Sequence, residues 1–189
     1  MFPLNRSRHR VRRLSRSDAA SLQVLYERCT DYHEQHEGIP TRPTAAEEEL
    51  SACPPGKQLS DKFALGVYSP DDVLVGYLDL MRDFPSAGEW QIGLLMLDPS
   101  QRGGGLGACV YGAAADWVAS QGAHTISLGV LEEAPRAERF WRRMGFEEVS
   151  RHPYVSETGR RAGRIIFMRR RLSPRPAGRA AAPEAPPGF

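Results

Sequence analysis

Four glycines lie within five residues between Gly103 and Gly107, directly after Arg102 and just before an apolar pattern with helical spacing. Glycines packed this densely permit positive φ angles and let the backbone approach a ligand closely. A helix that begins at the end of such a loop points its unpaired N–H groups into the loop, where they attract anions. The loop therefore predicts a binding site for a phosphate or pyrophosphate group.

Three alternatives compete for this loop. A P-loop needs a lysine and a hydroxyl residue after its last glycine, whereas residues 106–108 read Leu-Gly-Ala, so a P-loop is excluded. Gly103, Gly105 and Ala108 do fit the G-x-G-x-x-A pattern of a dinucleotide-binding loop. That pattern should open a series of parallel β-α-β units, and the segment before the loop does not alternate in this way. A tight glycine turn that binds no ligand is the third alternative.

The elements that lead up to the loop follow from the spacing of apolar residues. A basic first strand within residues 6–16 precedes a helix that begins near Ala19, and Thr44 starts a second, short helical pattern. The period then changes to that of strands. Three antiparallel strands are expected, over residues 63–68, 73–81 and 89–97. The last of them runs straight into the loop.

The elements after the loop alternate between helix and strand. A helix begins at Leu106 and is stopped by Gly122, a buried strand covers residues 125–131, and a further helix begins at Pro135 and ends at Gly145. Residues 146–150 and 163–169 are expected to form a closing hairpin. From residue 173 onward the chain is rich in proline and alanine. The sequence thus predicts one domain over residues 1–172 and a disordered tail over residues 173–189.

Composition excludes several classes of protein. A chain of 189 residues with 41% hydrophobic and 25% charged residues is typical of one globular domain, and a net charge of +2 gives no reason to expect a nucleic-acid partner. No apolar run approaches a membrane span, and the N-terminus lacks a secretory signal. His33 and His36 do not have zinc-motif spacing, and three scattered cysteines form no C-x-x-C pair. We expect a cytoplasmic protein without a metal or a membrane partner.

Two segments together resemble one enzyme family. The pattern Pro99-x-x-Arg102-x-x-Gly105-x-Gly107 after a strand resembles the acetyl-CoA signature of the GNAT family of N-acetyltransferases. Residues 137–146, A-E-R-F-W-R-R-M-G-F, resemble the later A-x-x-F-Y-x-x-x-G-F segment of that family. The order of predicted elements also matches. The resemblance implies an α/β (α+β) fold with a mixed, mostly antiparallel central sheet that is flanked by helices and splayed at an acetyl-CoA cleft.

The resemblance also implies a function. Acetyl-CoA would be the co-substrate, without a metal, and the acetyl group would pass directly to a primary amine of a small molecule. A homodimer would be in keeping with the family. The alternative is a catalytically silent, coenzyme-A-binding GNAT-like domain that acts as a sensor or interaction module. A Rossmann-type NAD(P)-binding protein is the further alternative, carried by the glycine pattern alone.

The donor site implied by the resemblance uses mainly backbone. The amides from Arg102 to Gly107 would hold the pyrophosphate, and the strand edge at Leu95–Leu97 would pair with the pantetheine arm. Gly93 is expected to host the bulge that begins the splay, and an N–H group near Leu97 would polarise the acetyl carbonyl. The expected coenzyme-binding residues are Leu95, Met96, Leu97, Arg102, Gly103, Gly104, Gly105, Leu106, Gly107, Phe140 and Arg143.

The resemblance also implies a base and an acid for the transfer. Glu89 is the expected general base, with Asp79 and Asp98 as alternatives on neighbouring strand positions. Trp141 stands where the family usually has its tyrosine acid, and an indole N–H cannot serve as an acid. Tyr154 is therefore the expected acid, and Tyr111 and water are the alternatives.

The acceptor site would lie along the segment between the first two predicted helices. The resemblance places one wall of the acceptor pocket there, so Tyr32 and His33 are the expected substrate-binding residues, with Glu37 nearby.

Trp141 is expected to be a packing residue.

Overall fold

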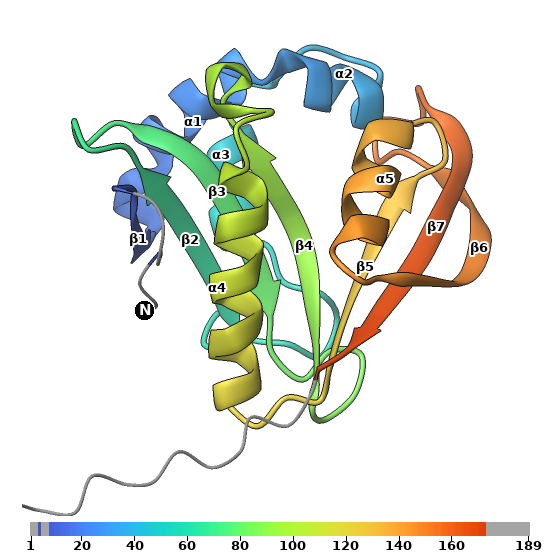
Figure 1. Ribbon diagram of the computed structural model, residues 1–189. Helices are drawn as coiled ribbons and strands as arrows, with labels where there is room; N and C mark the ends of the chain where they lie inside the picture. The colour runs from blue at the N-terminus through green and yellow to red at the C-terminus, as the bar shows by residue number, and fades with distance from the viewer. Residues whose placement is uncertain (1–3, 5–7, 173–189) are drawn as a thin grey trace, which may run out of the picture.

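The computed structural model describes residue 4 and residues 8–172, so the predicted tail of residues 173–189 lies outside the described residues. Seven strands form one sheet in the order β1-β2-β3-β4-β5-β7-β6 (Figure 1). They are β1 (Arg10–Arg13), β2 (Lys62–Tyr68), β3 (Leu74–Met81), β4 (Glu89–Leu97), β5 (Thr125–Leu131), β6 (Glu147–Val155) and β7 (Ala162–Arg171). Only β4 and β5 pair in parallel. The expected mixed, mostly antiparallel sheet is confirmed.

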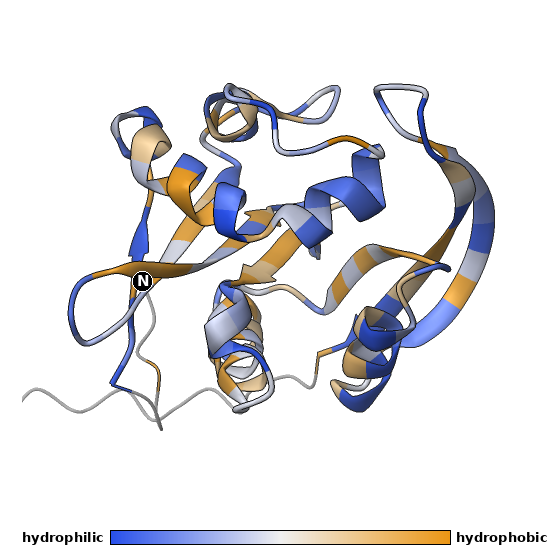
Figure 2. Cartoon of the chain, turned by 90° about the horizontal axis from the view of Figure 1, so that it is seen from above, coloured by the Kyte–Doolittle hydropathy of each residue, from blue (hydrophilic) through white to orange (hydrophobic). Residues whose placement is uncertain are grey.

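Five α-helices in the described part of the chain flank the sheet on two sides. They are α1 (Ala19–Arg28), α2 (Thr30–Glu37), α3 (Ala45–Ser51), α4 (Leu106–Ser120) and α5 (Pro135–Arg143). Figure 2 shows α4 and α5 on one face and α1 and α3 on the other. A hydrophobic core lies on each face of the sheet, and the side chains of β3 alternate between the two. Leu78 packs in the core with α4, and Tyr77 packs in the core with α1. Full burial of a side chain such as that of Leu78 contributes about 1.5–3 kcal/mol to the free energy of folding.

The sheet splays at a β-bulge in β4. The register pairs Asp79 with Leu94 and Leu80 with Ile92, so Gly93 is the additional residue on the β4 side. Before the bulge, Glu89–Ile92 pair with β5, and beyond Ile92 no residue of β4 has a partner there. Figure 1 shows β4 and β5 diverging toward the end of β4 that carries the glycine loop. The register thus confirms the bulge predicted at Gly93. A bulge bends the strand that carries the additional residue, and this bend accounts for the divergence of β4 from β5.

Most predicted elements are confirmed, and three differ in extent. The first strand is shorter than the basic segment that suggested it, covering Arg10–Arg13 only. Residues 30–37 form a separate helix, α2, between the first two predicted helices. The closing hairpin is longer than expected, because β6 continues through Pro153 to Val155. Pro153 is tolerated there because β6 is the edge strand of the sheet.

Candidate active site

The outer half of β4 presents unpaired main-chain groups. The N–H of Asp98 donates to the carbonyl of Val75 in β3 over 2.9 Å. Because hydrogen bonding alternates along an antiparallel strand, Met96 also turns its N–H and C=O toward β3, while Leu95 and Leu97 turn theirs toward the splayed side. The Leu97 carbonyl accepts from Arg102 Nε at 2.8 Å. The N–H groups of Leu95 and Leu97 and the carbonyl of Leu95 are left to pair with an extended ligand, as in strand addition.

The glycine loop, residues 102–107, connects this edge to α4. Gly103 and Gly105 have φ values of 81° and 85°, and Gly105 is the N-cap of α4. These left-handed conformations favour glycine. A Cβ atom built on Gly103, Gly104 or Gly105 meets no atom within 4 Å among the described residues, so the loop backbone borders open space. The first N–H groups of α4 point into this space and can bind an anion.

The Arg102 side chain is a brace for the loop. Its guanidinium forms a bidentate ion pair with Asp31 at the start of α2, with one of the two contacts at 3.1 Å. This pairing lowers the pKa of Asp31. Together with the hydrogen bond to Leu97, the pair ties the loop to α2 and to the end of β4. The contacts of the Arg102 side chain thus fix the position of the loop.

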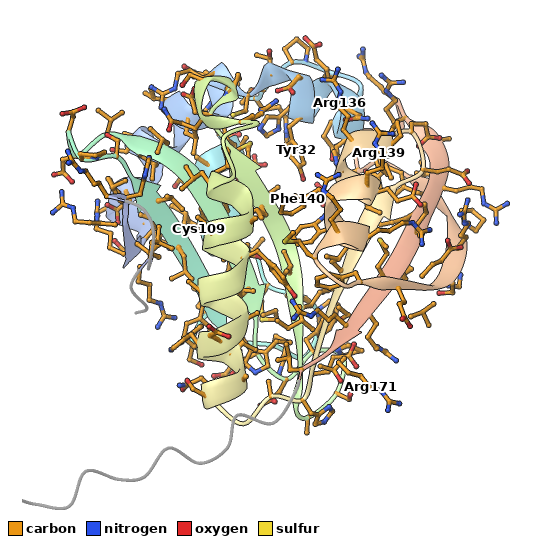
Figure 3. All side chains as sticks on the ribbon, in the orientation of Figure 1. Tyr32, Cys109, Arg136, Arg139, Phe140 and Arg171 are labelled. Atoms are coloured by element: carbon orange, nitrogen blue, oxygen red, sulfur yellow. The ribbon has the colours of Figure 1, made fainter. Side chains whose placement is uncertain are left out.

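Helix α5 lies across from the first turn of α4. A Cβ atom on Gly107 would be 3.5 Å from Phe140 Cε2, and Figure 3 shows Phe140 extending from α5 toward α4. Arg136, Arg139 and Arg143 fall on the same side of α5 as Phe140 by helical spacing, and all three are solvent-accessible. Only Arg143 was expected from the sequence.

Trp141 is a core residue rather than part of the site. Its side chain is buried, and its ring packs against Tyr111, Phe140 and Phe146, with centroids 4.8–5.6 Å apart. The predicted packing role of Trp141 is confirmed.

A pocket of about 330 Å³ opens on the opposite face of the sheet, and we call it the α2–α3 pocket. Its lining includes Tyr26, Tyr32, His33, His36, Glu37, Arg42, Glu48, Glu49, Lys62, Asp79, Gly93, Leu94 and Glu157. The presence of Gly93 and Leu94 in the lining means that the pocket reaches the bulge where the sheet opens. The unpaired edge of β4 and this pocket therefore meet at one point of the fold.

The α2–α3 pocket contains most of the buried polar atoms that lack a hydrogen bond. Within the described part of the chain, six buried side-chain nitrogen or oxygen atoms make no hydrogen bond, and four belong to this lining. These are Tyr26 OH, His33 Nε2, Glu37 Oε2 and Asp79 Oδ1. Buried polar groups are normally hydrogen-bonded, so a cluster of unsatisfied ones marks a place where a polar ligand binds.

Asp79 is the titratable group at the bulge. Its side chain is buried, and Oδ2 would lie only 2.4 Å from a Cβ atom on Gly93. Lys62 Nζ is 3.3 Å from Asp79 Oδ1 and 2.8 Å from Glu49 Oε1, and Tyr77 OH also donates to Glu49. Burial, followed by repulsion from Glu49, raises the pKa of Asp79 to about 6 despite Lys62. Asp79 can therefore take up a proton near neutral pH.

Aromatic side chains of α2 form the other wall of the pocket. Tyr32 packs on His36, with ring centroids 4.2 Å apart, and on His33 at 5.3 Å. Burial lowers the pKa of His36 to about 4 and also lowers the pKa of His33, so both rings are neutral at pH 7. Burial, followed by the nearby charge of Glu49, raises the pKa of Tyr32, whose hydroxyl therefore stays protonated. Figure 3 shows Tyr32 reaching from α2 toward the space between β4 and α5.

The two expected catalytic residues lie in different places. Glu89 is buried at the far end of β4, in the half that pairs with β5, and its Oε1 is 3.2 Å from Arg169 NH2. Tyr154 lies on β6, and its hydroxyl donates to the carbonyl of His36 over 3.2 Å, which holds the end of α2. Glu89 is thus not brought to the α2–α3 pocket, whereas Tyr154 contacts the helix that lines it.

The alternative acid and base candidates, Tyr111, Asp98 and Asp79, also lie in different places. Tyr111 is buried in the core, where its hydroxyl accepts from Arg170 over 2.9 Å. Asp98 caps the turn after β4 by accepting from the Ser100 N–H and pairs with Arg28 at 2.8 Å. Of all the carboxylates expected from the sequence to act as a base, only Asp79 lines the pocket.

The network around Asp79 was missed by sequence reasoning. One signal was available, since Tyr77, Asp79 and Met81 alternate along β3 and must therefore face the same side of the sheet. Nothing in the sequence places Glu49 of α3 beside them, because that contact depends on how α3 packs against the sheet.

Replacement of Gly93 by alanine tests how closely the bulge and Asp79 are packed. Because the new methyl group would overlap Asp79 Oδ2, we expect Gly93→Ala to lower the free energy of unfolding by about 1–3 kcal/mol. Urea denaturation measures this difference. Gly112→Ala is the matched control, since it lies within α4 with no atom within 4 Å of its Cβ position and should raise stability by about 0.8–1 kcal/mol. Equal effects of the two substitutions would contradict the close packing.

Within residue 4 and residues 8–172, no group of three or more histidine, cysteine, aspartate or glutamate side chains could hold a metal ion. No helix in the same residues is both long and apolar enough to cross a membrane.

Comparisons with known proteins agree with this geometry. Residues 22–146 match the sequence model of the acetyltransferase (GNAT) family. An acetyltransferase from Thermus thermophilus superposes with a TM-score of 0.71 at 18% identity, covering 87% of this chain and 97% of that one. A spermidine N-acetyltransferase from Vibrio cholerae, in complex with CoA and spermine, gives 0.69 at 18% identity, with 88% and 97% covered. The ribosomal-protein-S18-alanine N-acetyltransferase of Escherichia coli gives 0.66 at 14% identity, with 90% and 97% covered. No curated protein sequence is significantly similar to the chain.

Proposed function

The chain belongs to the acetyltransferase (GNAT) family, and we propose that it transfers the acetyl group of acetyl-CoA to a primary amine of a small molecule. One observation carries the proposal. The α2–α3 pocket, with the buried carboxylate of Asp79, opens at the Gly93 bulge where β4 begins to offer unpaired main-chain groups. An amine in the pocket and a thioester along the β4 edge would meet there, which gives the proximity that direct transfer needs.

We assign donor binding to the β4 edge, the glycine loop and α5. The N–H groups of Leu95 and Leu97 would hold the pantetheine arm and polarise the acetyl carbonyl, as oxyanion donors do. The amides of residues 103–107 would bind the pyrophosphate, since no Cβ contact obstructs the approach at the first three glycines. Phe140 would pack on the coenzyme, and the solvent-accessible Arg136, Arg139 and Arg143 would supply positive charge for its phosphates.

We assign the general base to Asp79, directly or through one water. A protonated amine would give a proton to the Asp79 carboxylate, and its nitrogen would attack the thioester carbonyl carbon. The C–N bond forms and the C–S bond breaks. The attacking nitrogen must then lose its second proton, and the leaving thiolate must gain a proton. Asp79 is a suitable base because its pKa of about 6 lies near neutral pH. A base with an ordinary aspartate pKa would accept the proton less readily.

Tyr32 is our candidate for protonating the leaving thiolate. Its hydroxyl makes no hydrogen bond with any described residue, and its raised pKa keeps it protonated. The charges that act on Tyr32 include Glu49, Glu37 and Asp79, which places the hydroxyl among the acidic groups of the pocket. Tyr154 remains the second candidate, although its hydroxyl already donates to His36. The tyrosinate then takes the second proton of the attacking nitrogen, directly or through water, and Asp79 releases the first proton to solvent, so the net products are the acetylated amine, free coenzyme A and one proton.

The assignment of Asp79 predicts a pH dependence. The base must be deprotonated to act, so kcat/KM should fall as the pH drops through about 6, by about tenfold per pH unit well below it. His36 should not contribute above pH 5, because its pKa is about 4. Initial rates at saturating acetyl-CoA between pH 5 and 9 give the profile. A flat profile across pH 6 would contradict the assignment.

The assignment of Tyr32 predicts a loss of kcat. We expect Tyr32→Phe to lower kcat about tenfold or more, since a positioned acid contributes about 10²-fold or more when fully used. Tyr154→Phe is the matched comparison. It should mainly lower stability, by about 1 kcal/mol for the lost hydrogen bond to His36. If Tyr154→Phe lowers kcat more than Tyr32→Phe does, the acid is Tyr154.

A two-step experiment tests the proposed function. Acetyl-CoA at a hundredfold excess over Kd should raise the melting temperature by about 5 °C or more, whereas NAD(P) should not. Free thiol released from acetyl-CoA is then followed with a set of primary amines. Amine-dependent thiol release supports the proposal. Stabilisation by acetyl-CoA without thiol release from any amine would overturn it and favour a coenzyme-A-binding module.

A further inference from the structure

The α2–α3 pocket carries more negative charge than one ammonium group needs. Five carboxylates line it, from Glu37, Glu48, Glu49, Asp79 and Glu157, against two cationic side chains, Arg42 and Lys62. The lining thus has three negative charges in excess of its cations, since its two histidines are neutral at pH 7. Both cations are already engaged, Arg42 with Glu48 at 2.7 Å and Lys62 with Glu49 at 2.8 Å. A cationic ligand would relieve the excess.

Two carboxylate oxygens in the lining are buried without a hydrogen bond, and they belong to different elements. Asp79 Oδ1 lies on β3 at the bulge with Lys62 Nζ 3.3 Å away, whereas Glu37 Oε2, at the last residue of α2, has no ion pair among the described residues. Asp79 is used by the transfer reaction proposed above, whereas that reaction leaves Glu37 without a role. A buried carboxylate oxygen without a hydrogen bond is costly, so its retention calls for a ligand that supplies a hydrogen-bond donor or a positive charge.

Glu37 is held in place by its surroundings. Its own carbonyl accepts from Thr158 Oγ1 over 2.7 Å, and the carbonyl of the preceding His36 accepts from Tyr154. Gly38 ends the helix with a φ of 71°. The carboxylate at the C-terminal end of α2 also adds to the negative end of the helix dipole, which favours a cation. Glu37 thus has a fixed main chain and an unsatisfied charge inside the pocket.

The remaining lining suits an extended cationic molecule. Apolar residues Ile39, Pro40, Ala45 and Leu94 line the same pocket and can contact methylene groups. The faces of Tyr26 and Tyr32 are aromatic surfaces that attract ammonium groups. The pocket therefore combines two separate anionic positions with apolar and aromatic contacts.

We propose that the acceptor bears a second cationic group in addition to the amine that is acetylated, as an aliphatic diamine or polyamine does, and that Glu37 binds this second group. The inference rests on the proposed function, because it takes Asp79 as the position of the reacting amine. It adds the substrate class and assigns Glu37 as a residue that determines specificity.

The test compares cadaverine with n-pentylamine, which have the same carbon chain but differ by one ammonium group. Thiol release at saturating acetyl-CoA should give cadaverine a kcat/KM at least about tenfold higher, beyond the factor of two for its two equivalent amines; tenfold corresponds to about 1.4 kcal/mol. Glu37→Gln should reduce this preference to about threefold or less. Glu34→Gln is the matched control on the same helix, since Glu34 does not line the pocket, and it should retain the preference.

Three outcomes would overturn the inference. Equal rates for the two amines would show that no second charge is recognised, while leaving the proposed acetyl transfer intact. A preference that persists in Glu37→Gln, with the fold verified by circular dichroism, would show that Glu37 does not bind the second group. No thiol release with either amine or with any other primary amine of the set, in a protein that acetyl-CoA still stabilises, would overturn the proposed function and this inference together.

Discussion

Asp79→Asn is expected to lower kcat/KM for amine acetylation by about 10²–10⁴-fold, the usual contribution of a positioned general base. The substitution preserves the shape of the side chain at the bulge but removes its ability to accept a proton. Acetyl-CoA binding should change little, because Asp79 lies on the pocket side of the sheet and the donor groups lie along β4 and the glycine loop. The decrease of kcat/KM near pH 6 should disappear with the carboxylate. Steady-state rates over the same pH range measure both effects.

Two further variants make this prediction specific. Asp71→Asn removes an equal charge at an exposed position of the β2–β3 turn and should leave both the rate and its pH dependence as in the parent protein. Glu89→Gln should lower stability through loss of the ion pair with Arg169 and should retain the pH dependence. If Glu89→Gln rather than Asp79→Asn removes the dependence on pH near 6, the base is Glu89.

Gly104→Val is expected to weaken acetyl-CoA binding by about 10–100-fold, because each charge-assisted hydrogen bond lost to a phosphate costs about 1.5–3 kcal/mol. Gly104 lacks the positive φ of Gly103 and Gly105, and its Cβ position has no atom within 4 Å. A side chain there should not strain the folded protein, so stability without ligand should stay within about 0.5 kcal/mol of the parent value. The new isopropyl group would occupy the space into which the loop amides point.

Calorimetric titration with acetyl-CoA measures the change in Kd, and thermal unfolding without ligand measures the change in stability. Gly112→Ala, within α4 and away from the loop, is the control that should bind acetyl-CoA as the parent does. Unchanged affinity in Gly104→Val would show that the loop does not hold the coenzyme. A large loss of stability without ligand would show instead that Gly104 is required for the fold.

The proposed donor side could be inferred from the sequence because it is built from backbone. A dense glycine loop marks a place where the backbone takes positive φ angles or approaches a ligand closely, and the strand before it and the helix after it have clear periodicity. Gly93 was also predictable as a bulge, since a glycine within an otherwise apolar strand marks a place where pairing is interrupted. The structure confirms the bulge and the splay that it begins.

The acceptor side could not be predicted in the same detail. Its groups come from α2, α3 and β3, and their proximity depends on helix packing that no local pattern encodes. Asp79 and Glu89 are both acidic residues on neighbouring strands. The sequence does not show which of the two faces the pocket. Asp79 faces the pocket at the bulge, whereas Glu89 is paired with Arg169 in the closed half of the sheet.

The ion pair between Arg102 and Asp31 connects the two sides. Arg102 belongs to the glycine loop and Asp31 to the first turn of α2, the helix that also supplies Tyr32 and His33 to the pocket. The arginine of the resemblance is therefore a structural link to the pocket wall, and in our proposal the phosphates are bound by main-chain N–H groups of the loop.

The central claim is that the β4 edge and the α2–α3 pocket together pass an acetyl group from acetyl-CoA to an amine. Simultaneous measurement of thiol release and acetylated product, with the protein, acetyl-CoA and cadaverine, tests it most directly. We predict thiol release that depends on cadaverine and matches the acetylated amine one to one by mass spectrometry, with a large loss in Asp79→Asn. Thiol release that is independent of the amine, or none at all in a protein that acetyl-CoA stabilises, would contradict the claim.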